Sequence, residues 1–167
     1  IPKIEKAKIY IINNGKSDAY NKLNYKNRSY KFVLFVGKRG RYKNFKILVE
    51  ALEKDHNLNL KLVGGGKLTK EEVHLLSKIG KDRYSHLGQV SNEELNILYN
   101  EAFCLVYPSA YEGFGIPVIE AQSAGCPVIA ANRSSLSEVV GDSGILLDNL
   151  SAKGISNAIA LLKNSAI

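Results

Sequence analysis

The stretch FCLVYPSAYEGFGIPVIEAQSAGCPVIAA, residues 103–131, contains a complete strand–loop–helix–strand unit. Its two ends, Phe103–Tyr107 and Pro127–Ala131, are short continuous apolar runs, as buried parallel strands require. Between them a loop leads into a helix, Pro117–Ala124, which begins with a residue favoured in the first helical turn. Two strands joined by a helix in this way lie parallel in one sheet, with a right-handed crossover.

The same alternation of apolar runs and helical periods extends along most of the chain. Further strands are expected at Lys8–Ile12, Lys31–Val36, Leu58–Val63, Tyr84–Leu87 and Gly144–Leu147. Further helices are expected at Phe45–Leu52, Thr69–Ile79, Ser91–Ala102 and Ile155–Leu162, and capping boxes at Thr69–Glu72, Ser91–Glu94 and Ser135–Glu138. The pattern predicts an α/β fold class, a Rossmann-like doubly wound parallel sheet with helices on both faces. In such sheets, ligands bind outside the carboxyl ends of the strands.

The composition is that of an ordinary globular domain. The chain has 167 residues, of which 45% are apolar and 23% are charged. No apolar run reaches the ~18 residues that a membrane span needs. Because the chain begins at Ile1 and contains no methionine, we expect it to be the carboxy-terminal part of a longer protein. Cys104 and Cys126 lie in apolar surroundings and are expected to be buried, reduced thiols of a cytoplasmic protein.

Positive charge is concentrated in the first part of the chain. Residues 1–46 contain thirteen Lys or Arg and two acidic residues, a net charge of +11, whereas residues 47–167 contain ten and fourteen, a net charge of −4. This asymmetry predicts an anionic partner for the first part, which could be a phosphate, a nucleic acid or a membrane surface. A solvated basic face or an exposed linker explains the charges of Lys3–Arg28 equally well.

Two loops at the expected carboxyl edge of the sheet fit an anionic ligand. The first, Gly37-Lys-Arg-Gly-Arg-Tyr-Lys-Asn44, places four cations and two glycines directly before a helix, a combination that suits a phosphate. The second, Gly64-Gly-Gly66, lets a ligand approach the backbone closely or simply makes a tight strand-to-helix turn. Its spacing is not the Gly-x-Gly-x-x-Gly of a dinucleotide fingerprint.

A third loop carries two carboxylates toward a helix start. Glu112 lies in the loop, beside two glycines, and Glu120 lies one turn inside the following helix. The free N–H groups of that helix start, such as those of Ile116 and Val118, can face an anion, and a carboxylate beside them can accept two vicinal hydroxyls. The arrangement predicts a site for a sugar joined to a phosphate, with two unrelated surface carboxylates as the alternative.

The spacing from Glu112 to Glu120 resembles the Glu-x7-Glu signature of the family 4 retaining glycosyltransferases, the "glycosyl transferases group 1" domain of GT-B enzymes. Further motifs in the family's order and spacing are Phe35–Gly37, Tyr42–Phe45, His86–Leu95 and Ser134–Gly144. The resemblance spans about Lys8 to Leu162. It implies that residues 1–30 are an interdomain segment with a first strand and a loop, and that residues 31–167 are the nucleotide-sugar-binding domain, with the acceptor domain on the amino-terminal side.

The resemblance also implies roles for individual residues. Arg39 and Lys43 match the basic pair that clamps the donor diphosphate, and Lys38 is a rival for the role of the arginine. Glu112 matches the glutamate that lies against the donor sugar, and Glu120 matches the one that holds the ribose hydroxyls. Arg39, Lys43 and Glu112 are therefore the expected catalytic residues.

Backbone contacts to the donor are implied at the loops of the same edge. The expected donor-binding positions are Gly37, Gly64, Gly65, Leu87, Gly88, Gly113, Phe114, Gly115 and Ile116, with the nucleobase near Leu87–Gln89. Pro117 departs from some relatives, because it has no N–H to offer a phosphate.

The reaction implied is retaining transfer of a hexose, mannose- or glucose-type, from a GDP- or UDP-linked donor to a glycan or lipid-linked acceptor in cell-envelope polysaccharide synthesis. The leaving diphosphate needs charge stabilisation, which Arg39, Lys43 and the helix start would supply. No Asp-x-Asp occurs, and basic residues can replace a divalent ion, so neither a metal nor a cofactor is expected. Such a protein is expected in the cytoplasm or on the inner face of the membrane, and this chain alone is expected to be inactive.

Two other functions remain open at this point. A GT-B sugar-nucleotide epimerase or hydrolase shares the architecture but has no transfer acceptor. A non-catalytic module that binds a polyanion through the basic amino-terminal part would show salt-sensitive binding that survives Glu120→Ala. If the protein is a glycosyltransferase, nucleic acid is not an expected partner, whereas an anionic membrane surface is compatible with that function.

Overall fold

The computed structural model describes residues 14–15, 17–24 and 31–165, and it confirms the predicted fold class. Among these residues six strands form one sheet in the order β3-β2-β1-β4-β5-β6, and all five strand pairs are parallel. The strands are β1 (Phe32–Val36), β2 (Asn59–Val63), β3 (Tyr84–His86), β4 (Cys104–Tyr107), β5 (Val128–Ala131) and β6 (Ile145–Leu147). The strand expected at Lys8–Ile12 lies outside the described residues.

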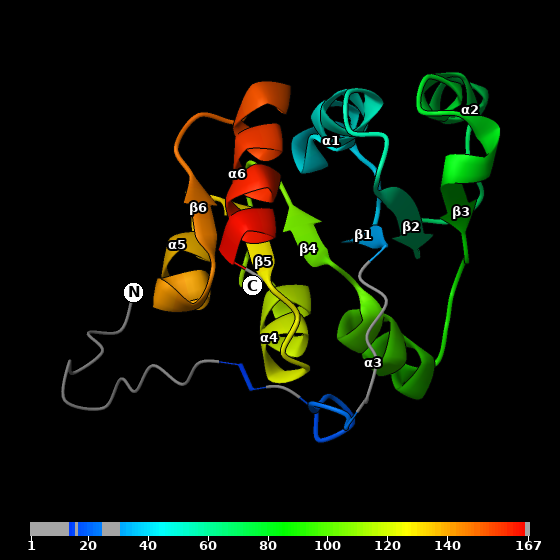
Figure 1. The fold of residues 1–167 in the computed structure, drawn as a ribbon. Coiled ribbons are helices and arrows are strands. Elements are labelled where there is room, and N and C mark those ends of the chain that lie inside the picture. The colour runs from blue at the N-terminus through cyan, green and yellow to red at the C-terminus, as the bar shows by residue number, and fades with distance from the viewer. Residues whose placement is uncertain (1–13, 16, 25–30, 166–167) are drawn as a thin grey trace, which may run out of the picture.

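Helices cover both faces of the sheet (Figure 1). They are α1 (Phe45–Glu53), α2 (Lys70–Ser77), α3 (Asn92–Glu101), α4 (Ile116–Ser123), α5 (Leu136–Val140) and α6 (Ala152–Ser165). One face is covered by α1, α2 and α6, and the other by α3, α4 and α5. Among the described residues, none of these helices is both long and apolar enough to cross a bilayer.

The two hydrophobic cores follow from the alternation of side chains along the central strands. In β1 the side chains of Val33 and Phe35 enter the core beneath α1 and α2, whereas Phe32, Leu34 and Val36 enter the core beneath α3 and α4. A strand that is buried on both faces must be apolar throughout, which is why its sequence shows a continuous apolar run. Cys104 and Cys126 are both buried, as predicted.

The predicted helix caps are confirmed in two cases and wrong in one. Thr69 and Glu72 form a complete capping box, with hydrogen bonds of 3.2 and 2.9 Å, and Ser91 and Glu94 form another. Ser135, in contrast, has helical backbone angles and makes no capping hydrogen bond through its side chain. Its hydroxyl donates instead to backbone carbonyls of a neighbouring loop, so this hydroxyl does not cap the start of the helix.

The described residues before β1 are attached to α3. Asn100 accepts a hydrogen bond from the Leu23 N–H (2.8 Å) and donates one to the Asn21 carbonyl (2.9 Å), and Asn96 accepts one from the Asn21 N–H (3.1 Å). Both asparagines are buried, so these bonds replace water for the polar groups involved. The side chain of Tyr20 enters the core between this segment and α3.

Candidate functional site

The loops that follow the strands meet at the carboxyl edge of the sheet. Backbone hydrogen bonds tie neighbouring loops together: Gly37 N to Val63 O (2.9 Å), Gly64 N to Gly88 O (2.6 Å) and Ala110 N to Tyr42 O (2.7 Å). The Asn44 side chain adds a fourth link, since its Nδ2 donates to Pro108 O at 2.8 Å. The predicted donor positions Gly37, Gly64 and Gly88 therefore belong to one connected rim.

Lys43 and Glu112 form a largely buried ion pair at this rim. The exposed fractions of their side chains are only 8% and 14%. Lys43 Nζ donates to Glu112 Oε1 and, at 3.0 Å, to the Tyr107 hydroxyl, and it lies 4.7 Å from the centre of the Tyr107 ring. The short helical turn η2 (Arg41–Lys43) before α1 places the lysine there. The structure thus brings together two of the three residues predicted to be catalytic.

The electrostatics of this pair keep the lysine charged. Burial lowers the pKa of Lys43, but the hydrogen bonds from its ammonium to Glu112 and Tyr107 outweigh burial, and the pKa is raised overall. Burial also raises the pKa of Tyr107 to about 12, so its hydroxyl stays protonated at neutral pH. A full positive charge therefore faces the Glu112 loop.

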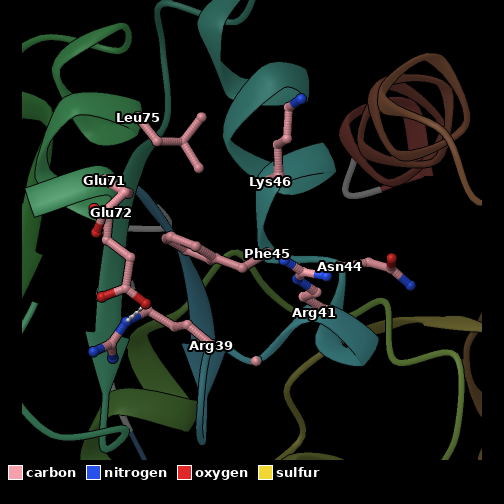
Figure 2. Close-up of a pocket in the computed structure, with 9 residues that line it drawn as sticks. Arg39, Arg41, Asn44, Phe45, Lys46, Glu71, Glu72 and Leu75 are labelled. Atoms are coloured by element: carbon pink, nitrogen blue, oxygen red, sulfur yellow. Dashed lines mark hydrogen bonds and ion pairs between the residues drawn. The ribbon is translucent and has the colours of Figure 1, made fainter. Parts of the chain in front are cut away.

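Arg39 has a different environment. Its Nε donates to Glu72 at 2.9 Å, as Figure 2 shows, and its side chain is 1% exposed. Its two terminal nitrogens donate to the carbonyl oxygens of Gly64 (2.9 Å), Gly65 (3.1 Å), Gly66 (3.0 Å) and Lys67 (3.3 Å). Arg39 is thus held in the loop after β2, and the structure does not pair it with Glu112. Its role toward a diphosphate stays a prediction, and Lys38 lies exposed on the same rim.

The conformation of the glycine loop explains these bonds. Gly64, Gly65 and Gly66 all have positive φ angles, of 78°, 75° and 69°, and their successive carbonyl oxygens reach one guanidinium. A Cβ atom at Gly65 would lie 2.4 Å from Arg39 Nη1 and 2.7 Å from Gly37 O. Glycine is therefore required at position 65 for close packing against Arg39.

A small cavity of about 180 Å³ lies beside Arg39, between the start of α1 and α2 (Figure 2). Its charged lining residues are Arg39, Arg41, Lys46, Glu71 and Glu72. Cations and acids are thus mixed on this side of the rim. Among the described residues, no three His, Cys, Asp or Glu side chains lie close enough together to hold a metal ion.

Glu120 is held by a tyrosine that the sequence did not identify as a partner. The Tyr99 hydroxyl donates to Glu120 Oε2 at 3.0 Å, and Tyr20 packs edge-on against the Tyr99 ring at 5.9 Å. Burial raises the pKa of the Glu120 carboxyl, and the hydrogen bond from the Tyr99 hydroxyl acts in the opposite direction. The Tyr20 hydroxyl donates to Asn92 Oδ1 at 3.1 Å. Both tyrosines stay protonated, because burial raises the pKa of Tyr20 to about 12 and also raises the pKa of Tyr99 well above its usual value. The sequence pattern predicts only that position 99 lies in the helix Ser91–Ala102.

The start of α4 departs in one respect from the prediction. The N–H of Val118 is not free, because it donates to the Gly115 carbonyl at 2.9 Å. Gly115 has a φ angle of 104° and lies against Leu136, so close that a Cβ would be 2.7 Å from the leucine Cδ2. Gly113 and Ile116 are exposed and Phe114 is half-buried, so three of the predicted donor positions reach the surface.

The end of β3 provides a further opening on the same rim. Leu87 is exposed, its N–H donates to Leu62 O at 2.9 Å, and Gly88 has a φ angle of 67°. A cavity of about 460 Å³ begins here and is lined by Lys61, Leu87, Gln89, Val90, Glu94, Ile97 and Leu98. The position predicted for the nucleobase therefore adjoins a partly apolar hollow.

The comparison with known sequences identifies relatives of the chain. The model of the family "Glycosyl transferases group 1" matches residues 17–166. The chain is 37% identical over 134 residues to O-antigen chain mannosyltransferase B of Escherichia coli, a match that covers 75% of this chain and 35% of that protein. It is 42% identical over 79 residues to O-antigen chain mannosyltransferase RfbU of Salmonella typhimurium, covering 47% and 22%. The chain thus spans about a third or less of these relatives.

Solved structures have the same fold. Sucrose-phosphate synthase from Thermosynechococcus elongatus matches with a TM-score of 0.70 and 31% identity, over 80% of this chain and 36% of that chain. HepE from Anabaena, solved in complex with UDP and glucose, matches with a TM-score of 0.73 and 24% identity, over 82% and 40%. The six-stranded sheet is that of one Rossmann-like domain of GT-B glycosyltransferases. The chain belongs to the family of glycosyl transferases group 1.

Proposed function

We propose that this chain binds the nucleotide diphosphate sugar of a retaining hexosyltransferase. The observation that carries the proposal is the largely buried ion pair of Lys43 and Glu112 at the carboxyl edge of a Rossmann-like sheet. A cation beside a carboxylate matches the two parts of such a donor, since the cation attracts the diphosphate and the carboxylate accepts sugar hydroxyls. Similarity to proteins named mannosyltransferases supports the same assignment.

The two glutamates would bind different parts of the donor. Glu112 lies in the loop before α4 and contacts Lys43, whereas Glu120 lies inside α4 and contacts Tyr99. In a glycosidase, two carboxylates face each other across one bond. Here each carboxylate has its own polar partner, which favours separate roles at the sugar and at the ribose.

In the reaction, the leaving diphosphate gains negative charge as the bond to the sugar breaks. Lys43 would stabilise that charge without a proton transfer, because its raised pKa keeps it an ammonium. The positive end of the α4 helix dipole would add a weaker contribution. The role needs neither a metal nor another cofactor from this chain.

The hexose is proposed to be of mannose or glucose type, linked to GDP or UDP. Mannose follows from the two O-antigen mannosyltransferase relatives, and UDP with glucose is bound in a structural neighbour. The acceptor would be a glycan or lipid-linked saccharide of the cell envelope, bound outside this chain, at the inner face of the membrane.

Thermal unfolding in the presence of sugar nucleotides tests the proposal. A ligand at 100 times its Kd stabilises the folded state by about 2.7 kcal/mol, so one GDP- or UDP-hexose of a panel should raise the Tm clearly. Lys43→Met should weaken binding of that donor by roughly tenfold to a hundredfold, the value of one charge-assisted hydrogen bond. Each shift is measured against the Tm of the same variant without ligand.

The matched control is Lys153→Met, which removes an exposed lysine of α6 and should bind the donor as the unaltered chain does. The proposal fails if no sugar nucleotide stabilises the chain, or if Lys43→Met binds the donor as tightly as Lys153→Met does. Product analysis with a labelled donor and the complete enzyme separates a transferase from a sugar-nucleotide epimerase or hydrolase, since only the transferase moves the label to an acceptor.

A further inference from the structure

The loop before α4, residues 108–115, is held from two sides by residues with unusual backbone angles. Among the described residues, only Asn44 and Ser134 combine a side chain with a positive φ angle, 51° and 47° respectively. Asn44 holds the start of the loop, because its side chain donates a hydrogen bond to Pro108 O. Ser134 holds the middle of the loop, because its Oγ accepts a hydrogen bond from the Glu112 N–H at 3.0 Å.

Such angles cost about 1–2 kcal/mol in a residue other than glycine, and they persist where the surroundings demand them. Both of these residues lie next to the same loop, one after β1 and one after β5. The strain is therefore concentrated on the two elements that flank Glu112, and not spread over the turns of the molecule.

Ser135 also holds this loop through hydrogen bonds. Its hydroxyl lies 3.0 Å from the Glu112 carbonyl oxygen and 2.9 Å from the Phe114 carbonyl oxygen, so it can donate to either. Leu136 follows directly and packs against Gly115. The consecutive residues 134–136 thus contact the loop at residues 112, 114 and 115, and we call them the serine clamp.

The clamp has an electrostatic consequence. Carbonyl oxygens carry partial negative charge and would repel the phosphates of a donor. The carbonyl oxygens of Glu112 and Phe114 both face the Ser135 hydroxyl, which balances part of the negative charge that they carry. The same bonds fix the backbone from which the Glu112 side chain extends to Lys43.

We infer that the hydroxyls of Ser134 and Ser135 are positioning groups for donor binding, which hold the Glu112–Gly115 loop in the shape that receives the nucleotide diphosphate sugar. The inference rests on the proposed function, but the loop geometry can be tested separately. The serine clamp replaces the capping role that the Ser135–Glu138 pattern predicts.

The test compares three variants of the full chain: Ser135→Ala, which removes the hydroxyl, Ser135→Thr, which keeps it, and Ser77→Ala. The last is the matched control, because the exposed Ser77 hydroxyl also donates to a backbone carbonyl (His74 O, 2.7 Å), but within α2. Hydrogen exchange of the amides of residues 112–116 and affinity for the sugar nucleotide are both measured.

Ser135→Ala should speed exchange of these amides roughly tenfold and weaken sugar-nucleotide binding roughly tenfold, the effect of one to two lost hydrogen bonds. Ser135→Thr should restore both values, and Ser77→Ala should change neither. If the amide exchange rates of Ser135→Ala are unchanged, the Ser135 hydroxyl does not hold the loop and the inference is wrong. Faster exchange with unchanged donor affinity overturns its role in binding. If the unaltered chain binds no sugar nucleotide, the proposed function and the positioning role both fall, whereas the exchange rates still decide whether the hydroxyl holds the loop.

Discussion

Substituting Gly65 by alanine should destabilise the fold much more than the same change at Gly66. The two glycines are neighbours with nearly equal φ angles, 75° and 69°. They differ in what a methyl group would meet. At Gly65 the added Cβ would lie 2.4 Å from Arg39 Nη1 and 2.7 Å from Gly37 O, whereas at Gly66 nothing lies within 4 Å. The pair therefore separates backbone strain from loss of packing.

The magnitude follows from the contacts of Arg39. Both variants bear the left-handed backbone cost of about 1–2 kcal/mol. Gly65→Ala must also displace either a guanidinium that is 1% exposed or the backbone of Gly37. Displacing the guanidinium breaks at least one charge-assisted hydrogen bond, worth about 1.5–3 kcal/mol. For a chain of this length that difference corresponds to roughly 3–12 °C in Tm.

Thermal and urea unfolding of both variants measure this difference directly. The expected order of stability is the unaltered chain, then Gly66→Ala, then Gly65→Ala, with unchanged m-values in urea because the fold is the same. Equal stability of the two variants would refute the reasoning, since it would mean that Arg39 does not depend on the shape of the glycine loop. In that case Arg39 would be free to move toward a ligand.

Two further changes test other parts of the structure. Burial raises the pKa of the Glu120 carboxyl above 4.5. The stability linked to this group is therefore greatest below pH 4.5 and is lost as the pH rises through the pKa of the folded state. Glu120→Gln should raise the Tm at pH 7, should raise it much less at pH 4, and should weaken donor binding. A lower Tm of this variant at pH 7 would contradict the assignment. Asn100→Ala should cost about 1–3 kcal/mol in urea unfolding, because it removes the hydrogen bonds to the Leu23 N–H and the Asn21 carbonyl, and it should speed proteolysis near residue 22. Unchanged cleavage would show that other contacts hold the segment.

The fold was predictable because its signals are local. A strand buried on both faces must be apolar throughout, and β1 and β4 show this in consecutive residues. The boundaries of the described strands agree with the predicted ranges to within one residue at either end. Strand order was not predicted, since it depends on pairings such as that of β1 with β4, whose sequences lie some 70 residues apart.

The side-chain partners were less predictable because they form across long separations. Tyr99 and Glu120 are 21 residues apart and Arg39 and Glu72 are 33 apart, and nothing in the local pattern of either pair indicates a contact. Ser135 shows the opposite case, in which a local pattern predicts a contact that the structure does not have. Its spacing to Glu138 satisfies a capping box, but two carbonyl oxygens of another loop lie within reach of the same hydroxyl, and the tertiary contacts prevail.

Charge balance indicates which cations would serve a donor diphosphate. In the described structure Arg39 is paired with Glu72, and Lys43 with Glu112, so each pair is close to neutral. A diphosphate brings about two negative charges and needs cations beyond those already balanced by acids. Lys38 and Arg41 lie on the same loop and are exposed to solvent, where an approaching phosphate can meet them. We therefore expect Lys38 and Arg41 to supply charge that the two ion pairs lack, beside the Lys43 ammonium that we propose contacts the leaving phosphate.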